Sequence, residues 1–329
     1  MDVRDFIRRK AELVQPVLLE YTRSENKKIE TMLQHTVGAG GKRIRPVLTM
    51  LACEAVGGDV MKVLPAAASI ELLHTFTLVH DDIVDRDLER RGKPTVHAKW
   101  GVDMAIIVGD TLYSKAYAAL VDVRENGISD GKVLDALGVL NWANSEIHEG
   151  QILDMMFENM DRIGIDDYME MIRKKTGVML NASLRIGSIL GGGSREEINA
   201  LSSFGDSIGT AFQMHDDLLD VIADQKKLGK PIGSDIRKKK KSILVIYALN
   251  NLKAKEKKQL IGLMERSSKS EQAVREAIEL ITDSGAIEYA QNMVKSMTED
   301  AKGRLKVLKD SEAKSNLLDV ADYIIERNY

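Results

Sequence analysis

Apolar residues recur at three- and four-residue spacing along almost the whole chain, which is the period of an amphipathic α-helix. The first such segment covers residues 3–19, and alternating runs that would indicate strands are nearly absent. Helical patterns follow at about 43–56, 65–88, 102–122, 131–160, 167–190, 195–224, 241–251, 255–266, 271–283, 286–308 and 312–327. The pattern predicts an all-α protein.

Glycine-rich turns separate these segments, but no linker or low-complexity stretch divides the chain into halves. We therefore predict one helical domain over residues 1–329, with a core at about 30–250 and outer helices at 251–329. The segments 65–88 and 131–160 are apolar over much of their circumference, which is typical of helices inside a bundle. The remaining question is what chemistry such a bundle carries.

Composition excludes several classes of protein. The chain has 329 residues, 44% of them hydrophobic, and a net charge of −3, which is too small to indicate a nucleic-acid partner. Its one cysteine, Cys53, allows no internal disulfide and fits a reducing compartment. No continuous apolar run of membrane-spanning length and no signal-peptide core are present. We expect a cytoplasmic protein without a membrane span.

Three aspartates, Asp81, Asp82 and Asp85, end the apolar segment 65–88. On a helix of about 3.6 residues per turn, positions 81 and 85 lie on one face and 82 lies beside them. Like charges this close repel one another unless a cation binds between them. Mg²⁺ is commonly held by one or two carboxylates together with substrate phosphates. The group fits a magnesium–phosphate site, and the alternative is a solvated acidic helix end.

The same pattern occurs again at residues 212–220, where an aromatic residue and a histidine precede Asp216, Asp217 and Asp220. Chance duplication of the whole string is improbable, so the repeat favours the metal interpretation. Two such helices facing each other would line one cavity with six carboxylates. Spacing alone does not identify a metal site, because Asp166, Asp167 and Glu170 have the same spacing at a helix start, where we interpret Asp167 and Glu170 as a capping box.

Positive charge is concentrated in four short segments. They are residues 41–46, 90–94, 174–177 and 229–241. Cations beside flexible glycines suit a diphosphate, although each segment alone also fits a solvated turn or helix end. The first is not a P-loop, because Thr36 and Arg43 replace the required glycine and hydroxyl residue.

His74 lies seven residues before Asp81, so a helix would place it two turns away and nearly in line. It could donate to a phosphate beside the metal. The alternative is a histidine satisfied within the core.

These motifs resemble those of the trans-isoprenyl diphosphate synthase family, in particular its short-chain, archaeal-type geranylgeranyl members. The two aspartate-rich motifs match residues 81–85 and 212–220, and Gly-Lys-x-x-Arg-Pro matches 41–46. The remaining matches are Arg90 and Arg91 with Gly92, Lys175 with Thr176, Gly150-Gln151-x-x-Asp154, Lys230 and Lys240. No motif is matched after residue 250.

The resemblance implies an isoprenoid synthase-like helical bundle around an apolar cavity. It also implies a Mg²⁺-dependent, head-to-tail condensation of isopentenyl diphosphate with dimethylallyl, geranyl or farnesyl diphosphate. Family members are commonly homodimers, and we expect three Mg²⁺ ions when substrate is bound.

The implied residue roles fall into four sets. Asp81, Asp85 and Asp216 bind Mg²⁺, supported by Asp82, Asp217 and Asp220. Arg90, Lys175, Lys230 and Lys240 hold the allylic diphosphate, and Lys42, Arg45, His74 and Arg91 bind isopentenyl diphosphate. The oxygens of Thr176 and Gln213 are candidates to stabilise the allylic cation, which water would quench.

Product length is expected to depend on Phe76 and Thr77, because residues five and four before the first motif form the cavity floor in family members. A helical wheel places Phe76 about 140° from Asp81, so the wheel alone does not show that it faces the cavity. The aromatic residue followed by threonine resembles the archaeal geranylgeranyl pattern. We expect a C20 product, with C15 as an intermediate or co-product.

Three other functions are compatible with parts of the sequence. A terpene cyclase would share the helices and the first motif, but cyclases usually carry a different second motif. A non-catalytic partner subunit would be expected to lack motif residues, and none is missing here. A nucleic-acid module built on the cationic run 237–241 would show salt-dependent binding.

Overall fold

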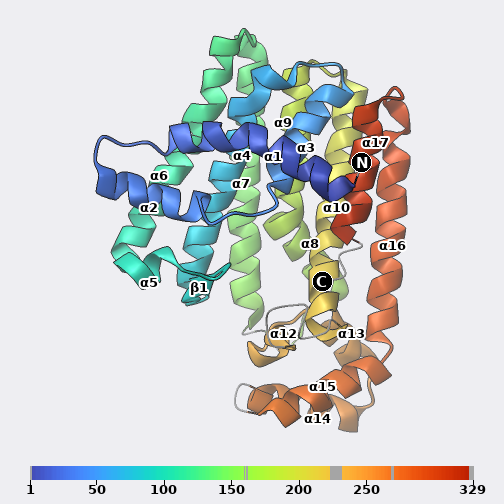
Figure 1. Cartoon of the computed structure of the whole chain (residues 1–329). Helices are drawn as coiled ribbons and strands as arrows, with labels where there is room; N and C mark the ends of the chain where they lie inside the picture. Colours follow the sequence, from blue (N-terminus) through green and yellow to red (C-terminus); the bar gives the residue numbers. More distant parts are fainter. Residues whose placement is uncertain (1, 159, 161, 223–231, 268–269, 326–329) are drawn as a thin grey trace. The chain divides into compact units, whose positions relative to one another are not determined.

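The computed structural model describes residues 2–158, 160, 162–222, 232–267 and 270–325, most of which are helical (Figure 1). The chain forms two compact units. The first comprises residues 1–144, 179–205 and 304–320, and the second comprises residues 145–178, 206–303 and 321–329. The single domain expected over the whole chain stays a prediction.

The first unit contains the N-terminal helices and the only strands among the described residues. Its complete elements are α1 (Val3–Tyr21), α2 (Lys27–Val37), α3 (Ile44–Ala55), α4 (Val60–Val84), β1 (Glu89–Arg90), β2 (Lys93–Pro94), α5 (Val96–Trp100), α6 (Val102–Val121), η1 (Asp122–Asn126) and η4 (Leu305–Val307). It also holds parts of α7 (Asp130–Glu158), α9 (Val178–Gly191), α10 (Arg195–Ile222) and α17 (Glu312–Ile325).

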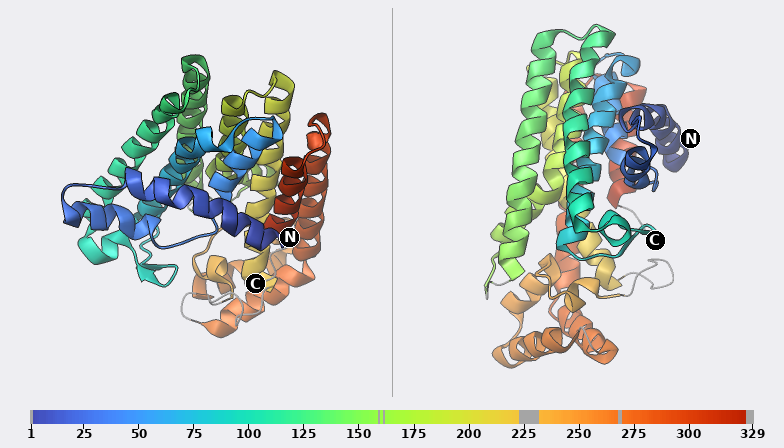
Figure 2. Two further views of the ribbon diagram at one scale, coloured as in Figure 1. Left: turned by 45° about the horizontal axis from the view of Figure 1, so that its top comes forward. Right: turned by 90° about the vertical axis from the view of Figure 1, so that its left-hand side faces the viewer.

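Helix α4 forms the centre of this unit and packs against α1, α3 and α6. Its buried residues, among them Val63, Ala67, Ile70 and Leu73, are distributed around the helix rather than along one stripe. This agrees with the apolar sequence, which left no polar face for solvent. Figure 2 shows α1 and α2, in dark blue, crossing over the lighter blue α3 and α4.

The ends of α4 differ from the predicted 65–88. The helix starts earlier because the Asp59 side chain accepts a hydrogen bond from the Met61 N–H at 2.9 Å, and Pro65 lies inside the helix. It ends at Val84, and Arg86 takes a left-handed backbone conformation with φ of 57°. A two-stranded hairpin, β1–β2, follows where only a turn was expected. Asp85 therefore caps the helix instead of lying within it.

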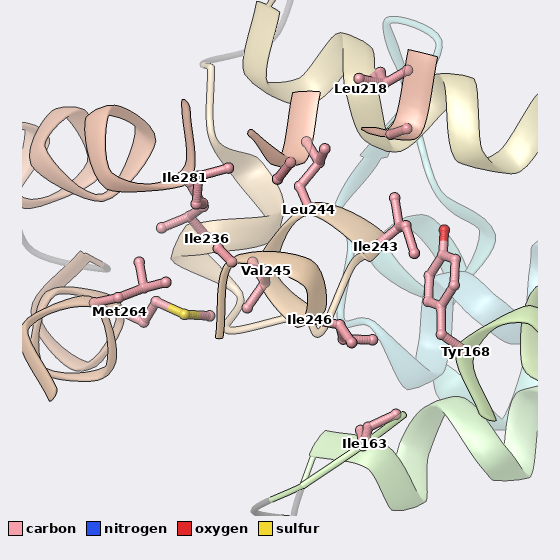
Figure 3. Close-up of a cluster of buried hydrophobic side chains, with 14 of the residues drawn as sticks. Ile163, Tyr168, Leu218, Ile236, Ile243, Leu244, Val245, Ile246, Met264 and Ile281 are labelled. Carbon is pink, nitrogen blue, oxygen red and sulfur yellow. The ribbon is translucent and has the colours of Figure 1, made fainter. Parts of the chain in front are cut away.

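The second unit is built around a short helix whose first four residues are apolar and buried. Its complete elements are α8 (Ile165–Ile172), the π-helix η2 (Arg173–Gly177), α12 (Ser234–Arg237), α13 (Ile243–Asn251), α14 (Ala254–Arg266) and α15 (Glu271–Asp283), with nearly all of α16 (Ala286–Arg304). Residues 243–246 of α13 are all buried. Figure 3 shows them surrounded by side chains from other helices, including Tyr168, Leu218, Met264 and Ile281.

The segment predicted as one helix at 167–190 is interrupted. It consists of α8, the π-helix at residues 173–177 and α9. π-turns inside α-helices are frequent at functional sites because they redirect side chains. The interpretation of Asp167 as a capping residue holds, but with other partners. Asp167 is the third helical residue and accepts from the Gly164 N–H at 2.9 Å.

Two helices of the described chain are long and apolar enough to span a membrane by length and composition alone. In α4, 72% of the apolar window is buried, as expected for a core helix. In the segment Val102–Asn126, which contains α6, only 39% is buried. Helix α6 therefore presents an apolar face, including Ile106 and Ile107, that its own unit does not cover.

Candidate active site

Both acidic motifs lie at the C-terminal ends of helices, α4 for the first and α10 for the second. Neither helix has a basic residue in its last turn. Carboxylates at this end are disfavoured by the partial negative charge of the helix dipole. The placement is unfavourable for helix stability and favours the binding of cations.

The first motif divides its aspartates by exposure. Asp81 and Asp85 are partly exposed, whereas Asp82 is only 2% exposed. Arg90, from β1, donates its Nε–H to Asp82 Oδ1 at 2.6 Å. Burial raises the pKa of Asp82, and the Arg90 hydrogen bond opposes that shift. The hairpin is thus tied to the end of α4 through the middle aspartate.

On the same helix, His74 meets Arg45 from α3. The Arg45 Nη1 to His74 Nε2 distance is 3.2 Å, and arginine can only donate, so Nε2 is the acceptor. Burial and the neighbouring arginines, Arg45 first, hold the pKa of His74 well below its usual value. His74 is therefore neutral, and only its Nδ1–H can donate to a phosphate.

Two cations of the hairpin segment contact backbone carbonyls just after α2. Arg91 donates to the Gly40 carbonyl, and Lys93 donates to the Gly38 carbonyl at 3.2 Å. Arg91 has a left-handed backbone with φ of 53° and, with Gly92 at 72°, forms the two-residue turn of the hairpin. A cavity of about 30 Å³, wide enough for a water molecule or two, is lined by residues that include Arg43, Glu71, Asp82, Arg90 and Arg91.

Phe76 is 5% exposed, and its ring lies within α4–α6 packing. The ring centroid is 4.8 Å from that of His80 and 5.3 Å from that of Tyr113 on α6. Tyr113 in turn lies 5.0 Å from Tyr117. The neighbouring Thr77 donates its hydroxyl to the His74 carbonyl at 2.8 Å. The rings of Phe76, Tyr113 and Tyr117 therefore pack one after another within the first unit.

In the second motif the middle aspartate is again buried, with 7% of Asp217 exposed. Its carboxylate accepts from the Tyr168 hydroxyl at 2.6 Å, the Gln213 amide at 3.1 Å and the Ile243 N–H at 3.4 Å. Burial, together with the nearby Asp235, raises the pKa of Asp217 to about 7. Its outer neighbour Asp216 is partly exposed.

The third aspartate, Asp220, caps a helix. Its two carboxylate oxygens accept from the Ser234 N–H at 3.0 Å and the Asp235 N–H at 2.9 Å, at the start of α12. Burial and the Asp220 charge raise the pKa of Asp235 to about 6. Asp235 thus joins the acidic cluster of this unit, although the sequence analysis did not select it.

The π-helix presents Lys175 and Thr176. Lys175 Nζ lies 2.6 Å from Asp154 Oδ2, and the Thr176 hydroxyl donates to Gln213 Oε1 at 2.9 Å. Two glycines make room for this turn. A Cβ on Gly209 would lie 2.6 Å from the Gly177 Cα, and one on Gly150 would lie 2.7 Å from the Lys175 Cα. The backbone of the turn therefore packs against positions 150 and 209 too closely for any side chain larger than that of glycine.

Of the late lysines, Lys230 lies outside the described residues. Lys240 follows α12, its N–H donates to the Asp235 carbonyl at 2.8 Å, and its charge lowers the pKa of Asp235. Lys240 thus lies beside the acidic cluster of the second unit.

The structure groups the predicted residues within each unit. The first unit holds the first motif with Lys42, Arg45, His74, Arg90 and Arg91, and the second holds the second motif with Lys175, Thr176 and Lys240. That the two motifs face each other stays a prediction. Within the described residues, no three carboxylate, histidine or cysteine side chains converge closely enough to hold a metal alone.

Sequence reasoning missed four residues around these motifs: Glu71, Tyr168, Asp235 and, as a structural residue, Arg43. Glu71 gave a signal, because a charge inside an otherwise apolar helix is rarely buried without a partner. Tyr168 and Asp235 gave none, since only the fold brings them to Asp217 and Asp220.

The family profile described as "Polyprenyl synthetase" matches residues 26–281. A short chain isoprenyl diphosphate synthase from Methanothermobacter thermautotrophicus is 44% identical over 332 aligned residues, covering 100% of both chains.

Two solved structures show the same all-α fold. Geranylgeranyl pyrophosphate synthetase from Pyrococcus horikoshii is 42% identical with a TM-score of 0.93, covering 99% of this chain and 98% of that one. A polyprenyl synthase from Caulobacter crescentus, complexed with calcium and isoprenyl diphosphate, is 29% identical with a TM-score of 0.89, covering 100% and 98%. The all-α isoprenoid synthase fold is thereby confirmed, and the chain belongs to the polyprenyl synthetase family.

Proposed function

We propose that this protein is a Mg²⁺-dependent synthase that condenses isopentenyl diphosphate head-to-tail with allylic diphosphates, with geranylgeranyl diphosphate as the main product. One observation carries the proposal. Each helix-terminal acidic motif has its middle aspartate held by protein hydrogen bonds while an outer aspartate is partly exposed. A cation lies near each motif, Arg90 on Asp82 in the first and Lys240 beside Asp235 in the second.

The carboxylates proposed to bind metal are Asp81, Asp85 and Asp216. All three are partly exposed, whereas Asp82 and Asp217 are buried, and Asp220, although partly exposed, uses both of its carboxylate oxygens to cap α12. Hard carboxylate oxygens suit Mg²⁺, and substrate diphosphate oxygens would complete each coordination shell. We expect three ions with substrate bound. The Caulobacter relative described with calcium and isoprenyl diphosphate supports a divalent ion in this family.

The proposed binding of the two substrates divides the cations. Arg90, Lys175, Lys230 and Lys240 hold the allylic diphosphate, and Lys42, Arg45, His74 and Arg91 hold isopentenyl diphosphate. Arg90 uses Nε for Asp82, which leaves its other donors for a phosphate oxygen. Neutral His74 donates through Nδ1, since Arg45 occupies Nε2.

The reaction begins when the allylic C–O bond breaks and its electron pair stays on the diphosphate oxygen. Mg²⁺ would supply positive charge beside that leaving group. Asp82 holds Arg90 and Asp154 holds Lys175, so each cation would need little reorganisation as negative charge develops. The isopentenyl double bond then forms the new C–C bond, and the departing diphosphate takes the proton that is lost.

The allylic cation needs oriented dipoles and a site without water. The Thr176 hydroxyl donates to Gln213 Oε1, and the Gln213 amide donates to Asp217. These bonds fix the oxygens of Thr176 and Gln213, so both can face positive charge without rotating.

Product length is proposed to be set by Phe76, with Thr77 beside it. The Tyr113 ring packs behind Phe76 and limits its movement. The Pyrococcus relative named a geranylgeranyl pyrophosphate synthetase supports a C20 product. The alternative is a farnesyl or bifunctional C15/C20 synthase.

We also propose a cytoplasmic homodimer. The uncovered apolar face of α6, with Ile106 40% and Ile107 59% exposed, suits burial against a second copy. Cys53 is buried and forms no disulfide, which fits a reducing compartment. Sedimentation equilibrium of the Ile107→Asp variant tests the interface, and an unchanged dimer would exclude this face.

The deciding experiment incubates the protein with Mg²⁺, isopentenyl diphosphate and each allylic primer, and measures product length. Chain elongation to C20 is expected. A cyclic hydrocarbon formed without isopentenyl diphosphate would instead identify a terpene cyclase. No turnover by the isolated chain, with activity restored by a related synthase, would identify a partner subunit.

A further inference from the structure

Arg43 has an unusual backbone conformation at a position that matters for the proposed site. It stands directly after Lys42 and two residues before Arg45, and it is the N-cap of α3 with φ of 49° and ψ of 36°. This left-handed conformation is disfavoured for residues with a Cβ. Within the described residues, the non-glycine positions with positive φ are Arg43, Arg86, Arg91 and Lys239, all cationic and all in or beside the motifs.

The Arg43 side chain shows what holds this conformation. Its guanidinium lies 2.5 Å from Glu71 Oε1 on α4, and it also donates to the Val37 carbonyl at the end of α2 and to Gln15 Oε1 on α1 at 3.4 Å. Both side chains of the Arg43–Glu71 pair are 5% exposed. One buried ion pair therefore joins the loop before α3 to three helices.

The Arg43 guanidinium donates to three protein acceptors, although it also lines the small cavity beside Arg90 and Arg91. Because its donors are used within the protein, its effect on a ligand would pass through the backbone to its neighbours. Glu71 lies three residues before His74 on α4, and His74 contacts Arg45. The pairs 43–71 and 45–74 thus connect the same two segments one helical turn apart.

We propose that the Arg43–Glu71 ion pair is a positioning device for isopentenyl diphosphate. It holds residue 43 in the left-handed conformation, so that the side chains of Lys42 and Arg45 can bind the same diphosphate. The inference rests on the proposed function, which assigns Lys42 and Arg45 to that substrate. Arg43 and Glu71 are positioning residues and contact no substrate themselves.

The test replaces both members together, because removing one would leave a buried, unpaired charge and destabilise the fold. Apolar replacement of a buried ion pair is often tolerated. The Arg43→Met/Glu71→Leu variant should therefore keep a melting temperature close to that of the wild type. Its KM for isopentenyl diphosphate should rise about tenfold or more, the size expected for losing a charge-assisted hydrogen bond. Its KM for the allylic substrate should stay within about twofold.

Two comparisons sharpen the test. The Lys10→Met/Glu54→Leu variant removes another ion pair of the same unit, between α1 and α3, and should leave both KM values unchanged. The second comparison uses two double variants, R43G/E71L and R43A/E71L. R43G/E71L should bind isopentenyl diphosphate more tightly than R43A/E71L, because glycine adopts positive φ without steric cost.

An unchanged KM for isopentenyl diphosphate in the folded Met/Leu variant would overturn the proposal, and so would an equal rise in both KM values. Calorimetric titration with isopentenyl diphosphate gives the same comparison without turnover. If the wild type binds this substrate but does not elongate it, the proposed function fails, while weaker binding by the variant still supports the positioning role.

Discussion

The two acidic motifs share a design but differ in how the buried middle aspartate is satisfied. Asp82 accepts a hydrogen bond from the guanidinium of Arg90. Asp217 instead accepts hydrogen bonds from neutral donors, which are the Tyr168 hydroxyl, the Gln213 amide and a backbone N–H. Asp217 also has acidic Asp235 nearby, which raises its pKa further. The first motif is thus partly neutralised by its own unit. In the second unit the nearby cation, Lys240, lies beside Asp235 rather than on the middle aspartate.

The largest expected effect comes from removing the outer aspartates. Asp81→Ala and Asp216→Ala should each lower kcat by at least about 10²–10³, comparable with losing one electrostatic stabiliser of the transition state. Asp167→Ala, which removes only a helix cap, is the matched control and should retain near-normal turnover. Steady-state kinetics at saturating Mg²⁺ measures this, and a near-normal rate for either variant would refute its role as a metal ligand.

The helix before the first motif is expected to set product length, and the helix before the second is not. Phe76→Ala should lengthen the product by at least one five-carbon unit, because it opens the space beside Tyr113. Phe212→Ala, four residues before Asp216, should change rate without lengthening. Chromatography of the dephosphorylated products decides this. Unchanged length in the first variant would show that Phe76 is not the floor.

Tyr168→Phe probes the neutral donors of the second motif. Loss of its hydrogen bond to the Asp217 carboxylate should lower kcat by about tenfold at most, with KM for both substrates nearly unchanged. The effect should be non-additive with Thr176→Val, because Asp217 and Gln213 connect the two hydroxyls. Tyr289→Phe in the same unit is the control. Additive losses would show that the connection does not act as a unit.

The smallest expected effect is on stability without metal. The pKa of Asp217 is raised to about 7 in the folded protein, above the ordinary value of 3.8, so the folded state binds this proton more tightly. Stability from this group is present at low pH and is lost as pH rises from about 4 through 7. Asp217→Asn should therefore raise the melting temperature of the metal-free protein at pH 8 by roughly 2–5 °C.

Asp82→Asn should shift the melting temperature at pH 8 in the same direction but by less, because burial also raises the pKa of Asp82 while the hydrogen bond from Arg90 opposes that shift. Melting curves in a chelator at pH 5 and pH 8 compare the two variants. An equal or larger shift for Asp82→Asn would show that the contrast between the motifs is wrong.

Much of the chemistry could be predicted from local sequence. Helical periodicity places Asp81 and Asp85 on one face whatever the rest of the chain does, and the repeat at 212–220 marks a second copy. The all-α class follows from the same periodicity. These features depend on residues within two turns of each other, so the sequence contains the needed information.

Other features required distant residues to meet. The hairpin at 89–94 is joined to α4 by the hydrogen bond from Arg90 to Asp82, and the π-turn at 173–177 needs Gly150 and Gly209 to admit its backbone. Arg43 is left-handed, and Glu71, 28 residues away, binds its side chain in the interior. Sequence alone determined which groups carry charge and which helices carry them. Tertiary packing decided which aspartates are buried and which stay partly exposed, since burial and partner geometry arise only when the helices pack together.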